Sequence, residues 1–223
     1  DLSVFVCGGP ADIRIYRPVY GLLFQQLVHA EIARVDLSLS ALVGIHNELN
    51  LGMIAGLGSE RQKATWQGRL ESFDALGAFC LTEPDHGSDA THMETKAVQA
   101  TRDNVKGWII NGEKMWTTGM HVATHCALFA RTSGNDGDAR GISCFLVPAK
   151  SPGVKVEEYM WTFNMPTDHP RVSFTDVFVP EDAQFGEVGR GLSLAQCFVH
   201  ENRIRQAASS LGAAVYCIKE SVK

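Results

Sequence analysis

The segment 79–89 combines hydroxyl, carboxylate and glycine residues in a pattern suited to holding a ligand. It reads Phe-Cys-Leu-Thr-Glu-Pro-Asp-His-Gly-Ser-Asp, so a short apolar strand is expected to run into a polar loop. Thr82 and Ser88 supply hydroxyl groups, and Gly87 allows the backbone to approach a bound molecule closely. The alternative is a tight connection in which these hydroxyls satisfy neighbouring backbone groups. The residue types alone leave both interpretations open.

The segment 108–119 adds aromatic and hydroxyl residues within a predicted β-hairpin. It reads Trp-Ile-Ile-Asn-Gly-Glu-Lys-Met-Trp-Thr-Thr-Gly. Asn111 and Gly112 suit a type I′ turn, in which both central residues have positive φ, and β-prone residues flank them on each side. The following strand is expected over 114–118 and carries Trp116 and Thr118. Taken alone, an aromatic residue in such a strand is most simply a core residue.

Taken together, these two segments resemble the acyl-CoA dehydrogenase flavoprotein family. Residues 79–89 are similar to the family signature T-E-P-x-x-G-S-D, and residues 114–119 are similar to the K-x-W-x-T-x-G strand that follows it. The order and the spacing of the two motifs fit the family as well. The resemblance covers residues 20–223, with shorter matches at 58–62, 177–180 and 189–192.

The resemblance implies an FAD site built from the first motif. The backbone of Phe79 and Leu81 and the hydroxyl of Thr82 would contact the pyrimidine side of the flavin. Gly87 and Ser88 would lie near the pyrophosphate or near the acyl-CoA ligand. A flavin needs hydrogen-bond partners around its ring nitrogens and oxygens, which this segment offers.

The same resemblance assigns roles to residues of the second motif and of the last helix. Trp116 would shield the edge of the flavin ring, and Thr118 would hydrogen-bond near its N5 and O4 atoms. Arg203 matches a family arginine on the CoA or pantetheine side of the acyl site. Read without the resemblance, Arg203 is a solvated or salt-bridged helix residue. Ser88 and Arg203 are thus the expected acyl-CoA-binding residues, and no metal site is predicted.

The family removes the α proton of its substrate with a carboxylate whose position differs among members. Most carry a Glu well downstream, and some carry it on the last predicted helix, immediately before the arginine. Asn202 occupies that second position and is not a base. Glu201 projects about 100° away around the helix and does not substitute for it. The chain begins at Asp1 without Met and ends inside a helical pattern, so we expect an excerpt whose base lies beyond Lys223.

The activity implied by the resemblance is α,β-dehydrogenation of an acyl-CoA thioester. A carboxylate takes the α proton while the β hydrogen leaves as hydride to flavin N5, and hydrogen bonds to the thioester carbonyl make the α proton acidic. An electron acceptor such as electron-transfer flavoprotein and a homodimer or homotetramer are expected. Two alternatives remain open: a flavoprotein oxidase of the same fold, and a non-catalytic binding protein. The excerpt alone is expected to be inactive.

One segment departs from the family pattern. Residues 163–170 read Phe-Asn-Met-Pro-Thr-Asp-His-Pro, where many members have a G-x-R-x-S-type stretch. This sequence resembles less studied branches, including those that act on unusual or long acyl chains. The length and the branching of the acyl group therefore stay open.

Two further groups of polar residues have simpler interpretations than catalysis. Glu83, Asp85 and Asp89 are expected to hold their loop by accepting hydrogen bonds from backbone N–H groups. His121 and His125 lack the H-E-x-x-H pattern and the cysteine partner of a zinc site.

The composition disfavours several other classes of protein. A net charge of −5 gives no footprint for nucleic acid, which calls for clustered lysine and arginine. No apolar run approaches the roughly 20 residues that cross a bilayer. The stretch 186–191 is glycine-rich but is not G-x-G-x-x-G within a βαβ unit, which disfavours a nicotinamide fold. The six scattered cysteines are expected to be reduced, as in a bacterial cytoplasm or, in a eukaryote, a mitochondrial matrix or peroxisome.

Hydrophobic periodicity predicts the elements that must position these residues. Helices are expected over 18–43, 44–57 and 59–73, the last with Ser59 and Gln62 as a capping box. A further helix is expected from Gly191 onward. Period-two patterns predict the strands 78–81, 95–100, 107–110, 114–118, 126–130, 142–148, 154–158 and 172–179.

This order of elements predicts an α+β multidomain chain. An α-helical N-terminal domain is expected over 1–76, and a β-barrel or sandwich middle domain over 77–188. Residues 189–223 would form the first helix of a truncated C-terminal helical bundle. The resemblance implies the same three-part architecture.

Overall fold

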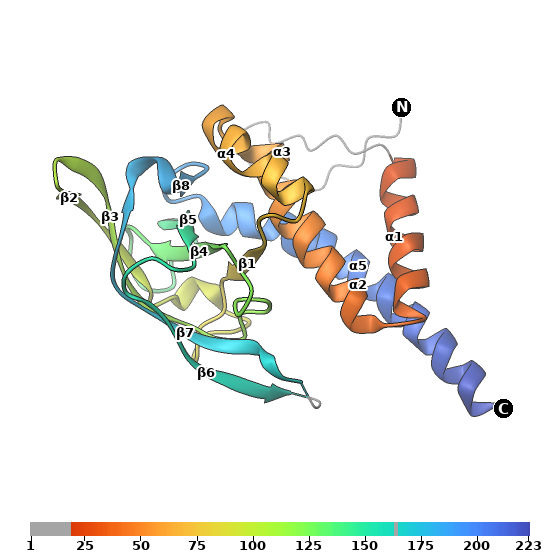
Figure 1. The fold of residues 1–223 in the computed structure, drawn as a ribbon. Coiled ribbons are helices and arrows are strands. Elements are labelled where there is room, and N and C mark those ends of the chain that lie inside the picture. The colour runs from red at the N-terminus through yellow and green to blue at the C-terminus, as the bar shows by residue number, and fades with distance from the viewer. Residues whose placement is uncertain (1–18, 163–164) are drawn as a thin grey trace. The chain divides into compact units, whose positions relative to one another are not determined.

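The computed structural model describes residues 19–162 and 165–223 of the 223-residue chain. The chain forms two compact units (Figure 1). The helical unit comprises Asp1–Leu57 and Ala195–Lys223, and the β unit comprises Gly58–Leu194. The domain boundaries expected at residues 76 and 188 differ from these limits and stay a prediction.

Helices α1 (Val19–Ala33), α2 (Leu37–Gly44), η1 (Ile45–Leu51) and α3 (Gly52–Leu57) lie in the first part of the helical unit. The expected helix over 18–43 is thus two helices, because Asp36 caps α2. Its carboxylate accepts hydrogen bonds from the backbone N–H groups of Ser38 and Leu39 at 2.7 and 3.1 Å. Segment η1 is a π-helix. The rest of the unit, Ala195–Lys223, contains most of helix α5 (Gly191–Ser221).

A network of buried polar side chains joins the helices of this unit. His29 contacts Glu48 through Nε2 at 2.9 Å and Ser40 through Nδ1 at 3.0 Å. The Ser40 hydroxyl bonds the Ser209 hydroxyl at 2.8 Å, and Arg205 Nε lies 3.5 Å from Glu48 Oε2. These contacts connect α1, α2, η1 and α5 through their polar groups.

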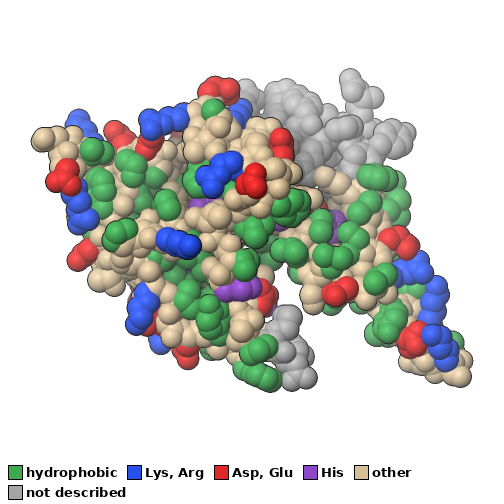
Figure 2. Space-filling view, viewed as in Figure 1, with side chains coloured by type: hydrophobic (Ala, Val, Ile, Leu, Met, Phe, Trp, Pro, Cys, Tyr) green, Lys and Arg blue, Asp and Glu red, His purple; other side chains and the backbone are tan. Residues whose placement is uncertain are grey.

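Hydrophobic side chains of α1 and α2 also reach the surface of the helical unit (Figure 2). The exposed ones are Leu23, Phe24, Leu27, Val28, Leu37, Leu39 and Leu42. Within the described part of the chain, the helices are too short or too polar to span a membrane.

The β unit begins with helix α4 (Glu60–Glu71), whose start is the capping box expected from the sequence. Gln62 N donates to Ser59 Oγ at 3.2 Å, and Ser59 N donates to Gln62 Oε1 at 3.0 Å. The Gln62 amide also donates to the carbonyls of Asp182 and Gln184 at 3.1 and 2.8 Å. The capping residue therefore also ties α4 to the end of the sheet.

The strands of the β unit form one curled, mixed sheet (Figure 1). Their order is β6-β7-β3-β2-β4-β5-β8, and β1 pairs with β4 in parallel. Short 3₁₀ turns, η2 (Ala90–His92) and η3 (Glu181–Ala183), lie in the connections. The strands are β1 (Gly77–Cys80), β2 (Lys96–Arg102), β3 (Val105–Lys114), β4 (His125–Arg131), β5 (Ile142–Pro148), β6 (Val154–Thr162), β7 (Met165–Pro180) and β8 (Gln184–Phe185).

The hairpin predicted at Asn111 and Gly112 is wrong. Strand β3 continues through both residues, and its pairing with β7 shifts register between Ile110 and Gly112. The turn lies instead at Asp103 and Asn104, with φ of 51° and 61°, between β2 and β3. Asp and Asn tolerate the left-handed conformation that a two-residue hairpin loop requires.

The core of the β unit lies on the inner face of the curled sheet. Trp108 packs edge-on against Phe145 with ring centroids 5.4 Å apart, which confirms Trp108 as a core residue. Other buried members of this cluster are Ala78, Cys80, Ala97, Ile110, Met120, Ala123, Cys126, Leu128, Ala130, Val147, Val172, Phe174, Val177 and Val179.

The cysteines follow the expectation only in part. Cys80, Cys126 and Cys144 are buried free thiols, and Cys217 is an exposed free thiol. Cys197 is disulfide-bonded, so the expectation that every cysteine is reduced is wrong for this residue. Scattered spacing without a C-x-x-C pair gave no signal for that bond. Cys7 lies outside the described residues.

Candidate functional site

The two motif segments lie side by side at the ends of β1 and β3. Met115 donates its backbone N–H to the Thr82 carbonyl at 2.9 Å. Lys114 Nζ donates to the Leu81 carbonyl at 3.1 Å. Residues more than 30 positions apart in sequence are therefore held side by side by these two hydrogen bonds.

A buried ion pair lies behind this junction. Lys114 Nζ is 2.8 Å from Glu83 Oε1, and the two side chains are 0% and 4% exposed. The Glu83 carboxylate also accepts the backbone N–H groups of Glu94 and Thr95 at 2.6 and 3.0 Å. Glu83 therefore links the loop after β1 to the start of β2 and the end of β3.

The protonation of this pair is set by burial and by mutual attraction. Burial lowers the pKa of the Lys114 amine below its usual range, and the Glu83 carboxylate opposes that effect. Burial by itself raises the pKa of Glu83, but the Lys114 charge and the hydrogen bonds to its carboxylate outweigh burial and hold that pKa below its usual value. The lowered pKa of Glu83 favours its ionised form, and the Glu83 carboxylate in turn favours the charged form of Lys114.

The residues expected to contact the pyrimidine ring of a flavin follow β1 directly. The Phe79 ring packs on Phe129 with centroids 4.9 Å apart, so its side chain is part of the packing. Leu81 and Thr82 are half-buried, and Ser88 is exposed. Among the described residues, the Thr82 N–H and the hydroxyls of Thr82 and Ser88 have no hydrogen-bond partner. These groups are available to a ligand.

Gly87 lies in open space on the same loop. A Cβ atom at this position would meet nothing within 4 Å, so internal packing does not require glycine here. The exposed loop therefore leaves the backbone at Gly87 accessible from outside the protein.

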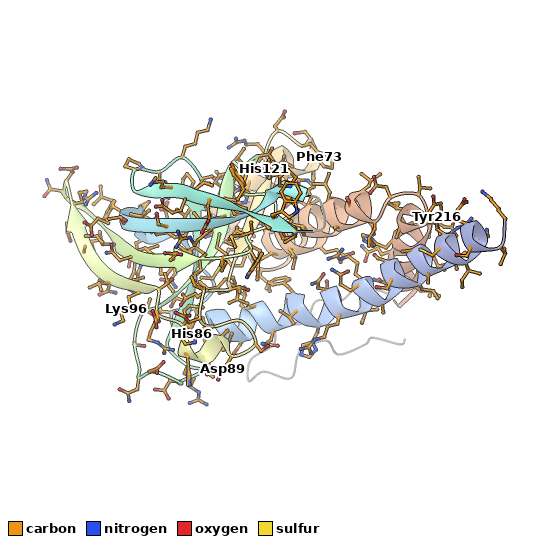
Figure 3. All side chains as sticks on the ribbon, turned by 90° about the horizontal axis from the view of Figure 1, so that it is seen from below. Phe73, His86, Asp89, Lys96, His121 and Tyr216 are labelled. Atoms are coloured by element: carbon orange, nitrogen blue, oxygen red, sulfur yellow. The ribbon has the colours of Figure 1, made fainter. Side chains whose placement is uncertain are left out.

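Two of the three loop carboxylates hold backbone groups, as expected. Glu83 does so as described, and Asp89 accepts the Thr91 N–H at 3.0 Å. Hydrogen bonds from the Thr91 hydroxyl and N–H hold the pKa of Asp89 below its usual value. Figure 3 shows Asp89 and His86 on this loop, where His86 Nε2 lies 3.4 Å from Glu94. Asp85 is exposed.

Trp116 departs from the extended strand predicted over 114–118. Strand β3 ends at Lys114, and Trp116 has φ of 61°, which is uncommon for a large L-residue. Its side chain is 43% exposed, unlike that of Trp108. Residues held in such sparsely populated backbone conformations cluster at functional sites.

The loop around Trp116 is anchored to the segment that departs from the family pattern. The N–H of Thr117 donates to the Pro170 carbonyl at 3.2 Å, and that of Gly119 donates to the Asp168 carbonyl at 3.1 Å. Thr118 is half-buried. Thr117, which the sequence did not single out, is buried and its Oγ1 has no hydrogen-bond partner among the described residues.

The remaining predicted residues lie on α5 in the helical unit. Arg203 is exposed, and Asn202 is half-buried with its Oδ1 accepting a hydrogen bond from Arg205. Glu201 is buried. Among the described residues, no cluster of potential metal ligands is found.

The helical and β units give the chain an α+β architecture, and sequence comparison identifies its family. Residues 19–74 match the N-terminal domain of acyl-CoA dehydrogenases, and residues 78–177 match the middle domain. The chain therefore belongs to the acyl-CoA dehydrogenase family.

Known relatives agree with this assignment. The chain is 35% identical over 187 residues to mitochondrial short-chain specific acyl-CoA dehydrogenase of Homo sapiens, covering 82% of this chain and 44% of that protein. The structure of butyryl-CoA dehydrogenase from Megasphaera elsdenii matches with a TM-score of 0.81 and 28% identity over 90% of this chain and 52% of that one.

A further solved relative contains the reduced cofactor. It is a glutaryl-CoA dehydrogenase from Mycobacterium smegmatis in complex with FADH2, with a TM-score of 0.79 and 31% identity over 91% of this chain and 50% of that one. The chain thus spans about half the length of the relatives that it matches.

Proposed function

We propose that the protein containing this chain is an FAD-dependent acyl-CoA dehydrogenase that oxidises the bond between Cα and Cβ of an acyl thioester. The observation that carries the proposal is the hydrogen bond from Met115 N to the Thr82 carbonyl, which joins the two motifs at one surface. The names of the relatives and the FADH2-bound structure support this activity and this cofactor.

The residues of the joined motifs fit a flavin. The backbone at Phe79 and Leu81 and the free N–H and hydroxyl of Thr82 are the proposed partners of the pyrimidine side. Gly87 and Ser88 are the proposed contacts to the pyrophosphate or to acyl-CoA. When bound, FAD supplies the acceptor for the hydrogen and electron pair that leave Cβ.

The proposed second half of the site shields and aligns the reacting atoms. Trp116 would cover the edge of the ring and exclude water, and Thr118 would donate a hydrogen bond near N5 and O4. Ser88 and Arg203 are the proposed contacts to acyl-CoA. Because the amide of Asn202 does not accept a proton at neutral pH, we assign the base to a carboxylate beyond Lys223.

The proposal extends to the protein's partners. Electron-transfer flavoprotein is the proposed electron acceptor, and a homodimer or homotetramer is the proposed assembly. The proposed compartment is the cytoplasm in a bacterium, and the mitochondrial matrix or the peroxisome in a eukaryote.

Anaerobic titration of the intact, FAD-loaded protein with acyl-CoAs tests this function. The panel spans short, long, straight and branched acyl groups, and the visible absorption band of the oxidised flavin is followed. Bleaching by one class of acyl-CoA is expected and names the substrate. Bound, dithionite-reducible flavin that no acyl-CoA bleaches would contradict the proposal. Rapid reoxidation of the bleached enzyme by O₂ would instead identify an oxidase.

A further inference from the structure

The ammonium group of Lys114 is buried behind the peptide that joins Leu81 to Thr82. Its Nζ atom donates to the Leu81 carbonyl at 3.1 Å, while the N–H of the next residue, Met115, donates to the Thr82 carbonyl at 2.9 Å. Two consecutive carbonyl groups are therefore held by two consecutive residues at the end of β3. This arrangement fixes the segment more firmly than a loop held by one hydrogen bond.

These contacts leave the other polar groups of Thr82 free for a ligand. The Leu81 carbonyl and the Thr82 N–H belong to one planar peptide unit, so fixing the carbonyl also fixes the direction of the N–H. A cation at the carbonyl oxygen polarises the unit and strengthens the N–H as a donor. Lys114 thus acts on the side of the peptide opposite to the donor.

Glu83 allows the ammonium group to remain charged in this position. A buried ammonium without a partner would favour losing its proton. The Glu83 carboxylate bonds Lys114 and is held in turn by the N–H groups of Glu94 and Thr95. The Lys114 ammonium therefore contacts the Leu81 carbonyl, while the Glu83 carboxylate is held by backbone N–H groups just before β2.

We propose that Lys114 and Glu83 are positioning residues for flavin binding, which fix and polarise the Leu81–Thr82 peptide so that Thr82 presents a directed donor to the ring. This inference rests on the proposed function and extends it to two residues buried behind the contact surface. The competing view is that the pair only stabilises the fold. In that case, a folded protein without the pair would bind FAD normally.

The test compares the intact wild-type protein with the double variant Lys114→Met/Glu83→Gln. The double variant replaces both charges with neutral side chains of similar length, so no unpaired charge is left buried. Circular dichroism and thermal unfolding establish that it folds. FAD titration then gives the dissociation constant, and the amide resonance of Thr82 in the apoprotein reports on polarisation without cofactor.

We expect the folded double variant to bind FAD about tenfold more weakly, as loss of groups that orient direct ligands commonly does. The Thr82 amide proton is expected to shift upfield in its apoprotein. The matched control is Arg61→Met/Asp182→Asn, which removes a 2.7 Å ion pair between α4 and η3 in the same unit. This control should leave both measurements unchanged.

An unchanged FAD dissociation constant together with an unchanged Thr82 resonance would overturn the inference and leave the proposed function standing. A wild-type protein that binds no FAD would overturn both this inference and the proposed function. If the double variant does not fold, Lys114→Gln/Glu83→Gln retains a donor at position 114 and leaves no charge buried. Wild-type FAD affinity and an unshifted Thr82 resonance in that variant would equally overturn the inference.

Discussion

The backbone of Gly112 packs directly on Thr95: a Cβ atom at position 112 would lie 2.4 Å from Thr95 Oγ1 and 2.6 Å from Thr95 Cα. The φ angle of Gly112 is 153°, a value that L-residues rarely adopt. Thr95 in turn donates its N–H to the buried carboxylate of Glu83. The glycine therefore permits a close contact that supports the polar anchor of the candidate site.

Gly112→Ala should destabilise the β unit, because the clash is with backbone atoms that have little room to move. The expected loss is about 1 to 3 kcal/mol, the usual cost of overpacking. Urea unfolding measures it. Gly68→Ala on α4 is the control, since its Cβ would meet nothing within 4 Å, and it should stabilise by about 0.5 to 1 kcal/mol. Equal effects of the two substitutions would contradict the packing argument.

The ionisation of Glu83 should make the stability of the protein decrease at acid pH. Its pKa in the folded protein is lower than in the unfolded chain, so the ion pair contributes fully above the ordinary carboxyl pKa of about 4.3. That contribution is lost as the pH falls through the lower, folded-state pKa. Glu83→Gln should cost about 3 to 5 kcal/mol at pH 7, because Lys114 is left unpaired.

Thermal unfolding between pH 7 and pH 3 checks this prediction. Wild-type stability should fall more steeply on the acid side than that of Glu83→Gln, and the two curves should converge. The control is Glu157→Gln, because Glu157 is a carboxylate whose pKa is also lowered but which lies in solvent. The stability of Glu157→Gln should change with pH in the same way as that of the wild type. Parallel curves for wild type and Glu83→Gln would refute the assignment.

The position of the β2–β3 turn can be tested by glycine substitution. Asn104 has φ of 61°, where glycine carries no steric cost, so Asn104→Gly should stabilise the protein by up to about 1 kcal/mol. Asn111→Gly should destabilise it, because the Asn111 side chain accepts the Asp176 N–H at 2.8 Å within the β3–β7 pair. Chemical denaturation of both variants measures the two effects. Destabilisation by Asn104→Gly together with stabilisation by Asn111→Gly would place the turn at Asn111.

Local sequence signals predicted some elements of this fold and not others. The capping box at Ser59 and Gln62 was predictable because it depends only on residues three apart. Asn111-Gly112 is a strong hairpin signal, yet Asp103-Asn104 forms the turn because pairing of β3 with β7 keeps β3 extended. Which of two plausible turns forms is decided by strand pairing, which local residue types do not encode.

Some features of the candidate site were likewise predictable from the sequence, and others were not. The resemblance assigned residues 79–89 and 114–119 to one flavin site, and the hydrogen bonds of Met115 and Lys114 hold the two segments side by side. The burial of Lys114 and Glu83 was not predicted, because charged side chains are usually exposed. The left-handed backbone at Trp116 depends on contacts with residues far along the chain, so residue type gave no signal for it.

The contact between Glu48 and Arg205 joins residues far apart in sequence within the helical unit. Both side chains are nearly fully buried, and a Cβ atom on Gly44 would lie 2.3 Å from Arg205 Nε, so glycine makes room for the guanidinium. Burial lowers the pKa of Arg205, and Glu48 opposes this effect. The carboxylate therefore compensates a buried positive charge.

Glu48→Gln should destabilise the helical unit by about 3 to 5 kcal/mol, because it leaves the Arg205 charge uncompensated. Adding Arg205→Met should restore part of this loss, since the double variant buries no net charge. Urea unfolding of the wild type, both single variants and the double variant gives the coupling energy. A coupling near zero would show that the two charges do not stabilise each other.

The backbone conformation of Trp116 predicts an unusual order of stability for two small substitutions. Alanine is ordinarily more favourable than glycine because glycine loses more backbone freedom on folding. At φ of 61°, however, an L-residue pays a steric cost of about 1 to 2 kcal/mol that glycine does not. Trp116→Gly and Trp116→Ala remove the same ring, so lost packing cancels between them. Trp116→Gly should be the more stable variant by about 1 kcal/mol, as measured by urea unfolding without cofactor. If Trp116→Ala is the more stable, the backbone at this position is not held in the left-handed conformation by the hydrogen bonds of Met115 and Thr117.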